Sequence, residues 1–497
     1  MVIKMRPKTP RIFISAAHKS SGKTTLSIGL CGALYAQGLS VQSFKKGPDY
    51  IDPLWLAKAS GGASEGRSCH NLDFNTMSHN EILRTLTSYA DAADISIIEG
   101  NKGLFDGVAL DGSDSNAAVA KLTQSPVILV IDTRGVTRGV APLLMGYQQF
   151  DPEVNIAGVI FNLSSGGRHE RKLRAVTEEY TDIPVLGVVK KNDLLTVDER
   201  HLGLKPSNEG QGATQKITDI SRIVADSVDL SKIIAIANNA PNLDMQERQI
   251  VTVVAKNTLT LRLGICDDSA FGFYYAGDKL ALEQAGAELI IINTLKDKCL
   301  PDNLDGLFIG GGFPETHMQA LSANTSMRKS ILDAIEAGLP TYAECGGLMY
   351  LSQSIHWKGK IAPMVGIIPA DSIMHKKPQG RGYVILEETA DMPWLSENDD
   401  DNQRETGDKF IKAHEFHYSA LSLNQKSSEK GLESKGKFAY KVHRGVGING
   451  EYDGWVYKNL LANYSHMRDT DSFHWAQRFI KTMRSHSKKH SYSENII

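Results

Sequence analysis

Short apolar runs rich in β-branched residues recur through the first half of the chain and alternate with helix-length segments. The clearest runs are RIFIS (11–15), ISIIEG (95–100), PVILVID (126–132), IAGVIFN (156–162) and PVLGVV (184–189). One intervening segment, Thr24–Gln37, has the length of a helix. Continuous apolar strands that alternate with helices indicate a parallel sheet covered on both faces. This half therefore predicts an α/β domain.

The same pattern starts again near residue 259. LTLRLGICDD (259–268), AELIIIN (287–293), DGLFIGG (305–311) and LPTYAEC (339–345) follow one another with helical stretches between them. We therefore predict a two-domain α/β chain in which each domain is a mostly parallel sheet covered by helices. The expected boundaries are a first domain at 10–240, a linker at 241–258, a second domain at 259–485 and a flexible tail at 486–497. Three polar segments, at 204–216, 396–409 and 424–437, read as exposed loops.

Length and composition agree with this division and limit the classes of partner that the protein is expected to bind. A chain of 497 residues is too long for one core, and 55 basic against 57 acidic residues leave a net charge of -2. That balance favours neither nucleic acid nor an anionic membrane surface. The five scattered cysteines predict neither structural zinc nor disulfides and suit a reducing cytoplasm. No apolar run has the length of a membrane-spanning helix, so we predict a cytoplasmic protein.

The first domain contains a candidate phosphate-binding loop. Residues 17–24 read AHKSSGKT, after a predicted strand and at the start of a predicted helix. Backbone N–H groups of such a loop wrap phosphates, Lys23 would bridge the outer ones, and the Thr24 hydroxyl would hold Mg²⁺. Ala17 stands where the usual pattern has its first glycine, and the alternative is a chance SGKT at a helix start. The candidate ATP-binding residues here are Ser20, Ser21, Gly22, Lys23, Thr24 and Thr25.

Two acidic stretches follow predicted strand ends, where ligands sit in open α/β sheets. KKGPDYIDP (45–53) places Asp49 and Asp52 beside two lysines, and IIEGNKGLFDG (97–107) places Glu99 directly after an apolar strand. Carboxylates at these positions can complete a magnesium shell or position a substrate. The alternative is that Glu99 and Asp106 are helix caps or solvated loop charges. An acid that ends a buried strand is poorly placed for that alternative, which favours a functional Glu99.

The second domain contains a candidate nucleophile, Cys345, in YAECGGLMYL (342–351). A strand, a sharp turn with glycines and then a helix project the side chain and place the sulfur at a helix N-terminus, which favours the thiolate. Gly346 can offer its backbone N–H to an oxyanion, and Gly312 in GGGFPE (310–315) can offer a second. As general base, the spacing leaves three candidates close to tied, which are His414, His417 and His466.

Taken together, these segments resemble the cobyrinate a,c-diamide synthase family, in which a dethiobiotin-synthetase-like ATPase domain precedes a class I type glutamine amidotransferase domain. Further motifs of the resemblance are NLDFN (71–75), DERHLGL (198–204), GRGYV (380–384), HEFHYS (414–419) and ANYSHMR (462–468). The resemblance implies a ligase that uses ATP, Mg²⁺ and L-glutamine to amidate the a and c acetates of a modified tetrapyrrole through an acyl phosphate. It also selects His466 as the base that serves Cys345.

The same resemblance assigns further residues and leaves some questions open. It implies roles in metal or substrate handling for Asp49 and Glu99, with Tyr50 and Asp106 as neighbouring substrate candidates, and an adenine contact for Asn162. Arg468 stands where many class I amidotransferases have a glutamate, so no third member of the cysteine–histidine site is assigned. The macrocycle is open, because the family includes members that amidate siroheme or nickel-sirohydrochlorin.

An alternative from another class is a P-loop regulatory ATPase with an amidotransferase-like module that only binds. Loss of the thiol or of the histidine would have favoured it, and both are present. As partners we predict the tetrapyrrole substrate, with no nucleic acid and no membrane, and we leave a homodimer open.

Overall fold

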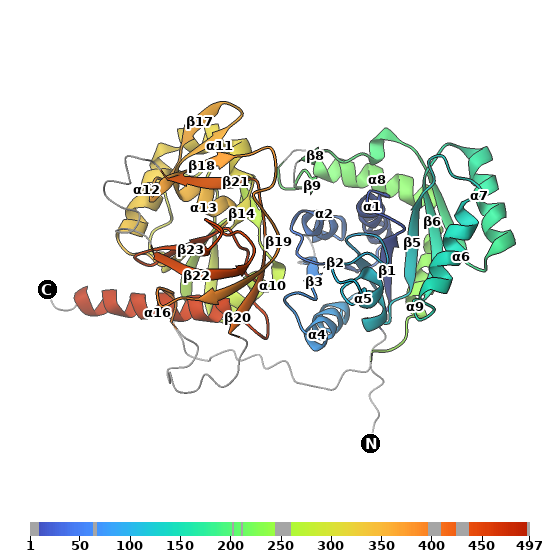
Figure 1. Ribbon diagram of the computed structural model, residues 1–497, viewed down its shortest axis with the longest axis horizontal. Coiled ribbons are helices and arrows are strands. Elements are labelled where there is room, and N and C mark those ends of the chain that lie inside the picture. The colour runs from blue at the N-terminus through green and yellow to red at the C-terminus, as the bar shows by residue number, and fades with distance from the viewer. Residues whose placement is uncertain are drawn as a thin grey trace, which may run out of the picture. The chain divides into compact units, whose positions relative to one another are not determined.

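A computed structural model describes residues 9–62, 67–200, 203–209, 212–243, 260–395, 409–423 and 437–494. The chain forms two compact units, which divide between residues 248 and 249 (Figure 1). Most of the predicted linker, nearly all of the predicted loops at 396–409 and 424–437, and the last three residues lie outside the described part. Among the described residues, none of the helices combines the length and the apolar composition needed to cross a bilayer.

The first unit is built on a seven-stranded sheet in the order β3-β2-β4-β1-β5-β6-β7. Every neighbouring pair of these strands is parallel. Their carboxyl ends therefore lie along one edge of the sheet. The strands are β1 (Arg11–Ala16), β2 (Val41–Lys46), β3 (His70–Leu72), β4 (Ile95–Glu99), β5 (Val127–Asp132), β6 (Ile156–Ser164) and β7 (Val185–Lys190).

Helices cover both faces of this sheet, as the alternation of apolar runs predicted. One core joins Phe13 of β1 with Leu86, Leu144 and Leu173 of α4, α6 and α7, while α1, α8 and α9 pack on the other face (Figure 1). The elements are α1 (Lys23–Ala36), α2 (Ile51–Ala59), α4 (His79–Ala90), α5 (Asn116–Leu122), α6 (Val140–Phe150), α7 (Gly167–Tyr180), the short helix η1 (Asp193–Leu195), the strands β8 (Glu199–Arg200) and β9 (Gly203–Leu204), α8 (Ala213–Ser227) and α9 (Leu230–Asn238). The predicted loop at 204–216 is therefore shorter than expected, because α8 begins inside it.

Helix α1, which follows the phosphate loop, is pressed closely against α8. A Cβ atom on Gly29 would lie 2.3 Å from a methyl group of Val224, and one on Gly32 would lie 2.1 Å from the hydroxyl of Ser221. Only glycine permits this approach of the two backbones. The contact fixes α1, and with it the end of the helix that faces the phosphate loop.

The second unit is built on a nine-stranded sheet in the order β12-β10-β13-β15-β24-β23-β22-β19-β20. The first five strands are parallel, and the remaining four continue the sheet in antiparallel pairs. The strands are β10 (Leu261–Cys266), β12 (Ala287–Ile292), β13 (Gly306–Ile309), β15 (Thr341–Glu344), β19 (Gly380–Glu388), β20 (Phe410–His417), β22 (Lys437–Arg444), β23 (Tyr452–Tyr457) and β24 (Leu460–Asn463). The two-domain α/β class is confirmed, and the antiparallel half is an addition to the prediction.

Helices again cover both faces of this sheet. One core contains Met318 of α11 and Ile331 of α12, and the opposite core contains Leu282 of α10 and Phe479 of α16. The remaining elements are α10 (Ala276–Gln284), α11 (Pro314–Ala323), α12 (Thr325–Glu336), α13 (Gly346–Leu351), α16 (Trp475–Glu494), and the strands of two small sheets, β11 (Phe271–Phe273) with β14 (Gly311–Gly312), and β16 (Ser352–Trp357), β17 (Lys360–Pro363), β18 (Ile368–Met374) and β21 (Ser419–Leu423). Helix α16 continues to Glu494, within the predicted tail at 486–497.

Candidate active sites

Cys345 lies at the junction between β15 and α13. Its backbone adopts a conformation that is rare for residues other than glycine. Its φ is 47° and its ψ is -97°, and its backbone N–H donates to the carbonyl of Asn463 at 2.7 Å. Such a strained turn between a strand and a helix holds a nucleophile in place and is typical of functional positions. The side chain is almost fully buried.

Strand pairing explains why His466 lies beside a cysteine that precedes it by more than a hundred residues. Strands β15 and β24 are parallel neighbours with Glu344 opposite Asn463, so their carboxyl ends coincide, and His466 follows three residues later. Burial by itself would lower the pKa of His466, but hydrogen bonds and charges of Cys345 and Glu344 outweigh burial and raise that pKa to about 10. This favours a protonated His466 imidazole beside the sulfur of Cys345.

The other two candidate histidines have different surroundings. His414 stacks on His466 with ring centroids 4.9 Å apart and planes at 16°, and burial next to His466 lowers the pKa of His414. A neutral His414 therefore supports one face of the His466 ring. His417 instead stacks on Tyr464 at 3.9 Å, with its Nδ1 2.7 Å from the carbonyl oxygen of Ser419. The side chain of His466 hydrogen-bonds that of Cys345.

The two glycines proposed for an oxyanion hole lie together. A Cβ atom on Gly346 would be 2.9 Å from the backbone nitrogen of Gly312. Because Gly346 is the first residue of α13, its N–H has no acceptor within that helix. Gly311 is equally constrained, since a Cβ there would lie 2.7 Å from Cε1 of His466. Glycine at these positions lets backbone and imidazole approach the thiol.

Glu344 is a residue of this site that sequence reasoning missed. Its Oε2 lies 3.3 Å from Nδ1 of His466, while its Oε1 accepts the backbone N–H of Met467 at 2.9 Å and the hydroxyl of Tyr342. A signal was present, because Glu344 is an acid at the end of a buried strand, which is the argument that singled out Glu99. Arg468, at the position where a glutamate was sought, lies over the ring of Tyr275 at 5.0 Å.

In the first unit, the phosphate loop leads into α1 as predicted from the motif. Gly22 is the N-cap residue with φ 85°, and the first turn of α1 contains no acidic residue, so its N–H groups are suited to an anion. Asn162, two residues before the end of β6, donates from Nδ2 to the carbonyl of Ser21 at 3.0 Å. A Cβ atom on Gly22 would collide with that amide at 2.2 Å. Asn162 therefore supports the phosphate loop.

The other predicted loop residues have local partners. Ser20 adopts a positive φ of 64°, and the hydroxyl of Ser21 donates to the carbonyl of His18 at 2.8 Å. The hydroxyl of Thr25 lies 3.5 Å from the carbonyl oxygen of Leu195. Lys23 is almost fully buried, and burial, followed by the charge of Lys45, lowers the pKa of Lys23 to about 8. A phosphate bound next to Lys23 would favour its protonated form.

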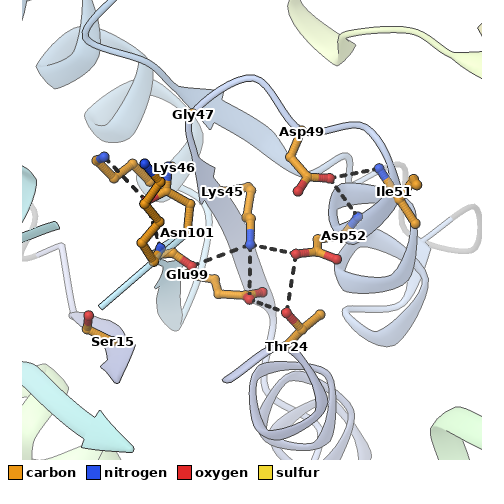
Figure 2. Close-up of polar contacts among 12 residues, drawn as sticks. Ser15, Thr24, Lys45, Lys46, Gly47, Asp49, Ile51, Asp52, Glu99 and Asn101 are labelled. Atoms are coloured by element: carbon orange, nitrogen blue, oxygen red, sulfur yellow. Dashed lines mark hydrogen bonds and ion pairs between the residues drawn. The ribbon is translucent and has the colours of Figure 1, made fainter. Parts of the chain in front are cut away.

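A cluster of charged side chains lies at the carboxyl ends of β2 and β4 (Figure 2). The ammonium of Lys45 is 2.6 Å from Oδ2 of Asp52 and 3.0 Å from Oε1 of Glu99, and the hydroxyl of Thr24 donates to that same Glu99 oxygen at 2.6 Å. Burial lowers the pKa of Lys45, but Asp52 and Glu99 outweigh it and raise the value. For Glu99, burial raises the pKa despite Lys45.

Asp49 stands slightly apart from this cluster. Its Oδ1 accepts the backbone N–H groups of Ile51 at 2.9 Å and Asp52 at 3.0 Å, which caps the start of α2 (Figure 2). Burial and the neighbouring charge of Asp52 raise the pKa of Asp49 to about 7. Tyr50 is the buried N-cap residue of α2, and Asp106 accepts the backbone N–H of Gly103 at 3.1 Å.

The residues present fit a magnesium ion that is shared with phosphates. Within the described ranges, no group of three or more His, Cys, Asp or Glu side chains is arranged to hold a metal by itself. Mg²⁺ in nucleotide sites, however, takes only one or two carboxylates and completes its shell with phosphate oxygens and water. Thr24, Asp52 and Glu99 supply such oxygens, and Oε2 of Glu99 is buried without a hydrogen-bond partner.

The first unit has a parallel sheet with a phosphate loop, and the second has a cysteine on a strained turn beside a histidine. Together these features indicate a glutamine-hydrolysing, amide-forming ligase with a nucleotide-binding domain. One family model matches each half: a CobQ/CobB/MinD/ParA nucleotide binding domain matches residues 12–204, and a CobB/CobQ-like glutamine amidotransferase domain matches residues 262–471. The class implies ATP and glutamine as co-substrates. This class is therefore preferred over the alternative, in which a regulatory ATPase carries an amidotransferase-like module that only binds.

Relatives that span the chain define the family. The cobyrinate a,c-diamide synthase of Magnetococcus marinus is 42% identical over 94% of this chain and 96% of that protein. Proteins of the same name from Methanosarcina acetivorans (38% identical, 92% of each chain) and Archaeoglobus fulgidus (36% identical, 95% of this chain and 97% of that protein) are also similar. The chain belongs to the cobyrinate a,c-diamide synthase family, as its motifs predicted.

Proposed function

We propose that this chain converts the a and c acetate carboxylates of a cobyrinate-type tetrapyrrole into amides, with ATP as activator and glutamine as nitrogen donor. The observation that carries the proposal is the likeness to relatives named cobyrinate a,c-diamide synthase, which covers both domains. Both reactive clusters that such a reaction needs are present in the chain. One cluster releases ammonia and the other activates a carboxylate.

In the glutamine half, the thiolate of Cys345 attacks the side-chain carbonyl carbon of glutamine. The oxyanion that forms accepts the backbone N–H groups of Gly346 and Gly312. His466 gives its proton to the departing nitrogen as the C–N bond breaks, and ammonia leaves. His466 then takes a proton from the water that attacks the thioester, which releases glutamate and restores the thiolate.

In the ATP half, an oxygen of a substrate carboxylate attacks the γ-phosphorus of ATP, which releases ADP and forms an acyl phosphate. Ammonia attacks the acyl carbon and the C–O bond to phosphate breaks. The attacking nitrogen loses one proton, which the departing phosphate takes, and a neutral amide remains. Lys23 and the N-terminus of α1 bind the transferring phosphates. Thr24, Asp52 and Glu99 would hold Mg²⁺, which supplies charge neutralisation to the phosphates when bound. Two rounds give the diamide.

In this proposal Asp52, a substrate candidate from the sequence, takes the metal position that the resemblance suggested for Asp49, because Asp52 lies beside Thr24. The other predicted site residues have supporting roles. Asp49 and Tyr50 shape the start of α2 next to Asp52, where the acceptor carboxylate must approach the phosphate. Asp106 belongs to the loop after β4 and would contact the substrate. Asn162 would contact the adenine through Oδ1, which is buried and without a partner, while its Nδ2 holds the phosphate loop.

The test is the mass gained by a panel of macrocycles incubated with Mg-ATP and glutamine. Cobyrinate, hydrogenobyrinate, sirohydrochlorin, nickel-sirohydrochlorin and siroheme are compared, with wild type beside Cys345→Ala. Two amide conversions on cobyrinate, lost with glutamine but kept with ammonia in the variant, are expected. Conversion of siroheme or a sirohydrochlorin instead would replace the substrate, and no mass gain on any macrocycle would overturn the proposal.

A further inference from the structure

The carboxylate of Glu344 is buried directly behind the imidazole of His466. Glu344 is 3% exposed and is the last residue of β15, so the backbone positions it next to Cys345 without any loop between them. Its two oxygens have separate partners. Oε1 takes the backbone N–H of Met467 and the hydroxyl of Tyr342, while Oε2 faces Nδ1 of His466 at 3.3 Å.

This division matters for the reaction. A carboxylate that accepts from Nδ1 fixes the tautomer and the ring orientation of a catalytic histidine and leaves Nε2 for the nucleophile. The two bonds to Oε1 prevent the carboxylate from rotating, because the chain segment at Met467 and the tyrosine of the same strand both hold it. His414 stacks on the imidazole, so the His466 ring is constrained both in its plane and on one face.

We propose that Glu344 is the positioning residue of a Cys345–His466–Glu344 triad, supplied by the residue immediately before the nucleophile. The position two residues after the histidine, where a glutamate was sought, is occupied by Arg468, whose guanidinium lies over Tyr275. The acid therefore reaches the histidine from the neighbouring strand. The negative charge of Glu344 stabilises the imidazolium, and the imidazolium stabilises the thiolate of Cys345.

The competing explanation is that Glu344 only ties strand ends together through Tyr342 and Met467. The two explanations differ in what the charge does. If the carboxylate is purely structural, removing its charge or one of its partners lowers the activity by the same factor at every pH. If the carboxylate positions His466, removing its charge changes the pKa values of His466 and Cys345. The pH dependence of alkylation and of glutamate release must then shift.

The experiment compares Glu344→Gln, Glu344→Asp and Tyr342→Phe. All are made in a Cys299→Ser background, because Cys299 is the exposed free cysteine and the other three besides Cys345 are buried. Two quantities are measured against pH: the rate of Cys345 alkylation by iodoacetamide and the rate of glutamate release from glutamine. ATP-dependent amidation with ammonia reports whether each variant is folded. Tyr342→Phe removes a partner of the same carboxylate but keeps its charge.

For Glu344→Gln we expect glutamate release to fall by about 10²-fold to 10⁴-fold. The basic limb of its pH profile should move to lower pH, and alkylation should require higher pH than in wild type. Glu344→Asp should recover part of the rate of glutamate release and part of the wild-type pH profile. Tyr342→Phe should lose less than about tenfold in glutamate release, and its pH profile should not shift. Unmoved limbs in Glu344→Gln, or equal behaviour of Glu344→Gln and Tyr342→Phe, would overturn the proposal.

This inference rests on glutamine hydrolysis and not on the tetrapyrrole substrate. Alkylation and glutamate release require no macrocycle, so a wrong substrate assignment leaves both readouts intact. Conversely, the triad can fail while the panel still shows amidation from ammonia. The two proposals are therefore tested separately.

Discussion

The thiol site and the phosphate site use the same structural device and differ in how their charges are balanced. Both lie at the carboxyl ends of parallel strands, where a strand turns into a helix: β15 into α13, and β1 through the loop into α1. In the thiol site, His466 contacts both Cys345 and Glu344, so all the partners come from the chain itself. In the phosphate site, carboxylates surround Lys45, and one Glu99 oxygen has no partner.

This difference separates a site that the polypeptide completes from a site that ligands must complete. In the thiol site, His466 and Glu344 come from the chain itself, so this site needs only glutamine. At the phosphate site, burial raises the pKa of both Glu99 and Asp49, which means that the chain supplies too little positive charge for its acids. A divalent cation bound with the nucleotide would supply that charge.

The sharpest way to break the comparison is to remove a charge from the phosphate site alone. Glu99→Gln should lower ATP-dependent amidation by about 10²-fold to 10³-fold, because it takes away a metal-facing charge in a buried site. The loss should be equal with glutamine and with ammonia as nitrogen source, while alkylation of Cys345 stays unchanged. Mass gain and alkylation rates measure the two halves. A loss confined to glutamine would contradict the division of labour.

A smaller effect is expected from moving the histidine without changing any charge. In Gly311→Ala the new methyl would lie 2.7 Å from Cε1 of His466, so the imidazole must shift. A displacement of about 1 Å at a catalytic group costs on the order of 10²-fold, and we expect glutamate release to fall by about 10-fold to 100-fold. Ammonia-dependent amidation should persist.

Gly277→Ala is the matched control for this change. It adds the same methyl to the same unit at a position where nothing lies within 4 Å of the new atom. If both variants lose glutamate release equally, the effect is not due to His466. If Gly311→Ala retains full activity, the close contact between glycine and imidazole does not constrain the reaction.

The parts that were predictable from sequence are those determined by local pattern. Each quoted apolar run corresponds to a strand, and the phosphate loop and Cys345 were identified from the residues on either side of them. These features need only a strand end, a glycine and a following helix. The choice of His466 needed the family resemblance, because pairing between β15 and β24 joins segments more than a hundred residues apart.

The features that escaped prediction depend on pairing and on side-chain direction. The antiparallel half of the second sheet follows from which strands meet, which apolar alternation does not specify. Glu344 was visible as a buried acid, but its partner His466 follows a different strand, β24. Lys45 was noted only as a neighbour of acids, and alternation along β2 decides that it, and not Lys46, faces Glu99, as Figure 2 shows.

The smallest expected effect concerns stability and tests the charge imbalance directly. The pKa of Asp49 is raised to about 7, whereas that of an unfolded aspartate is about 3.9. Between these values the folded protein holds a proton that the unfolded chain releases, so this residue's contribution to stability is full at low pH and is lost as pH rises toward 7. Asp49→Asn carries no such titration, and its Oδ1 can still accept both N–H groups that cap α2.

Relative to wild type, Asp49→Asn should therefore gain stability as the pH rises from 4.5 to 8, with no further gain above pH 8. Urea midpoints of the first unit, measured without nucleotide or metal at several pH values, give the difference. Added Mg-ATP should shrink it, because bound cations supply the charge that the acids lack. A constant difference across pH would mean that Asp49 is already ionised at low pH, and the acids of the phosphate site would then be as well balanced as those of the thiol site.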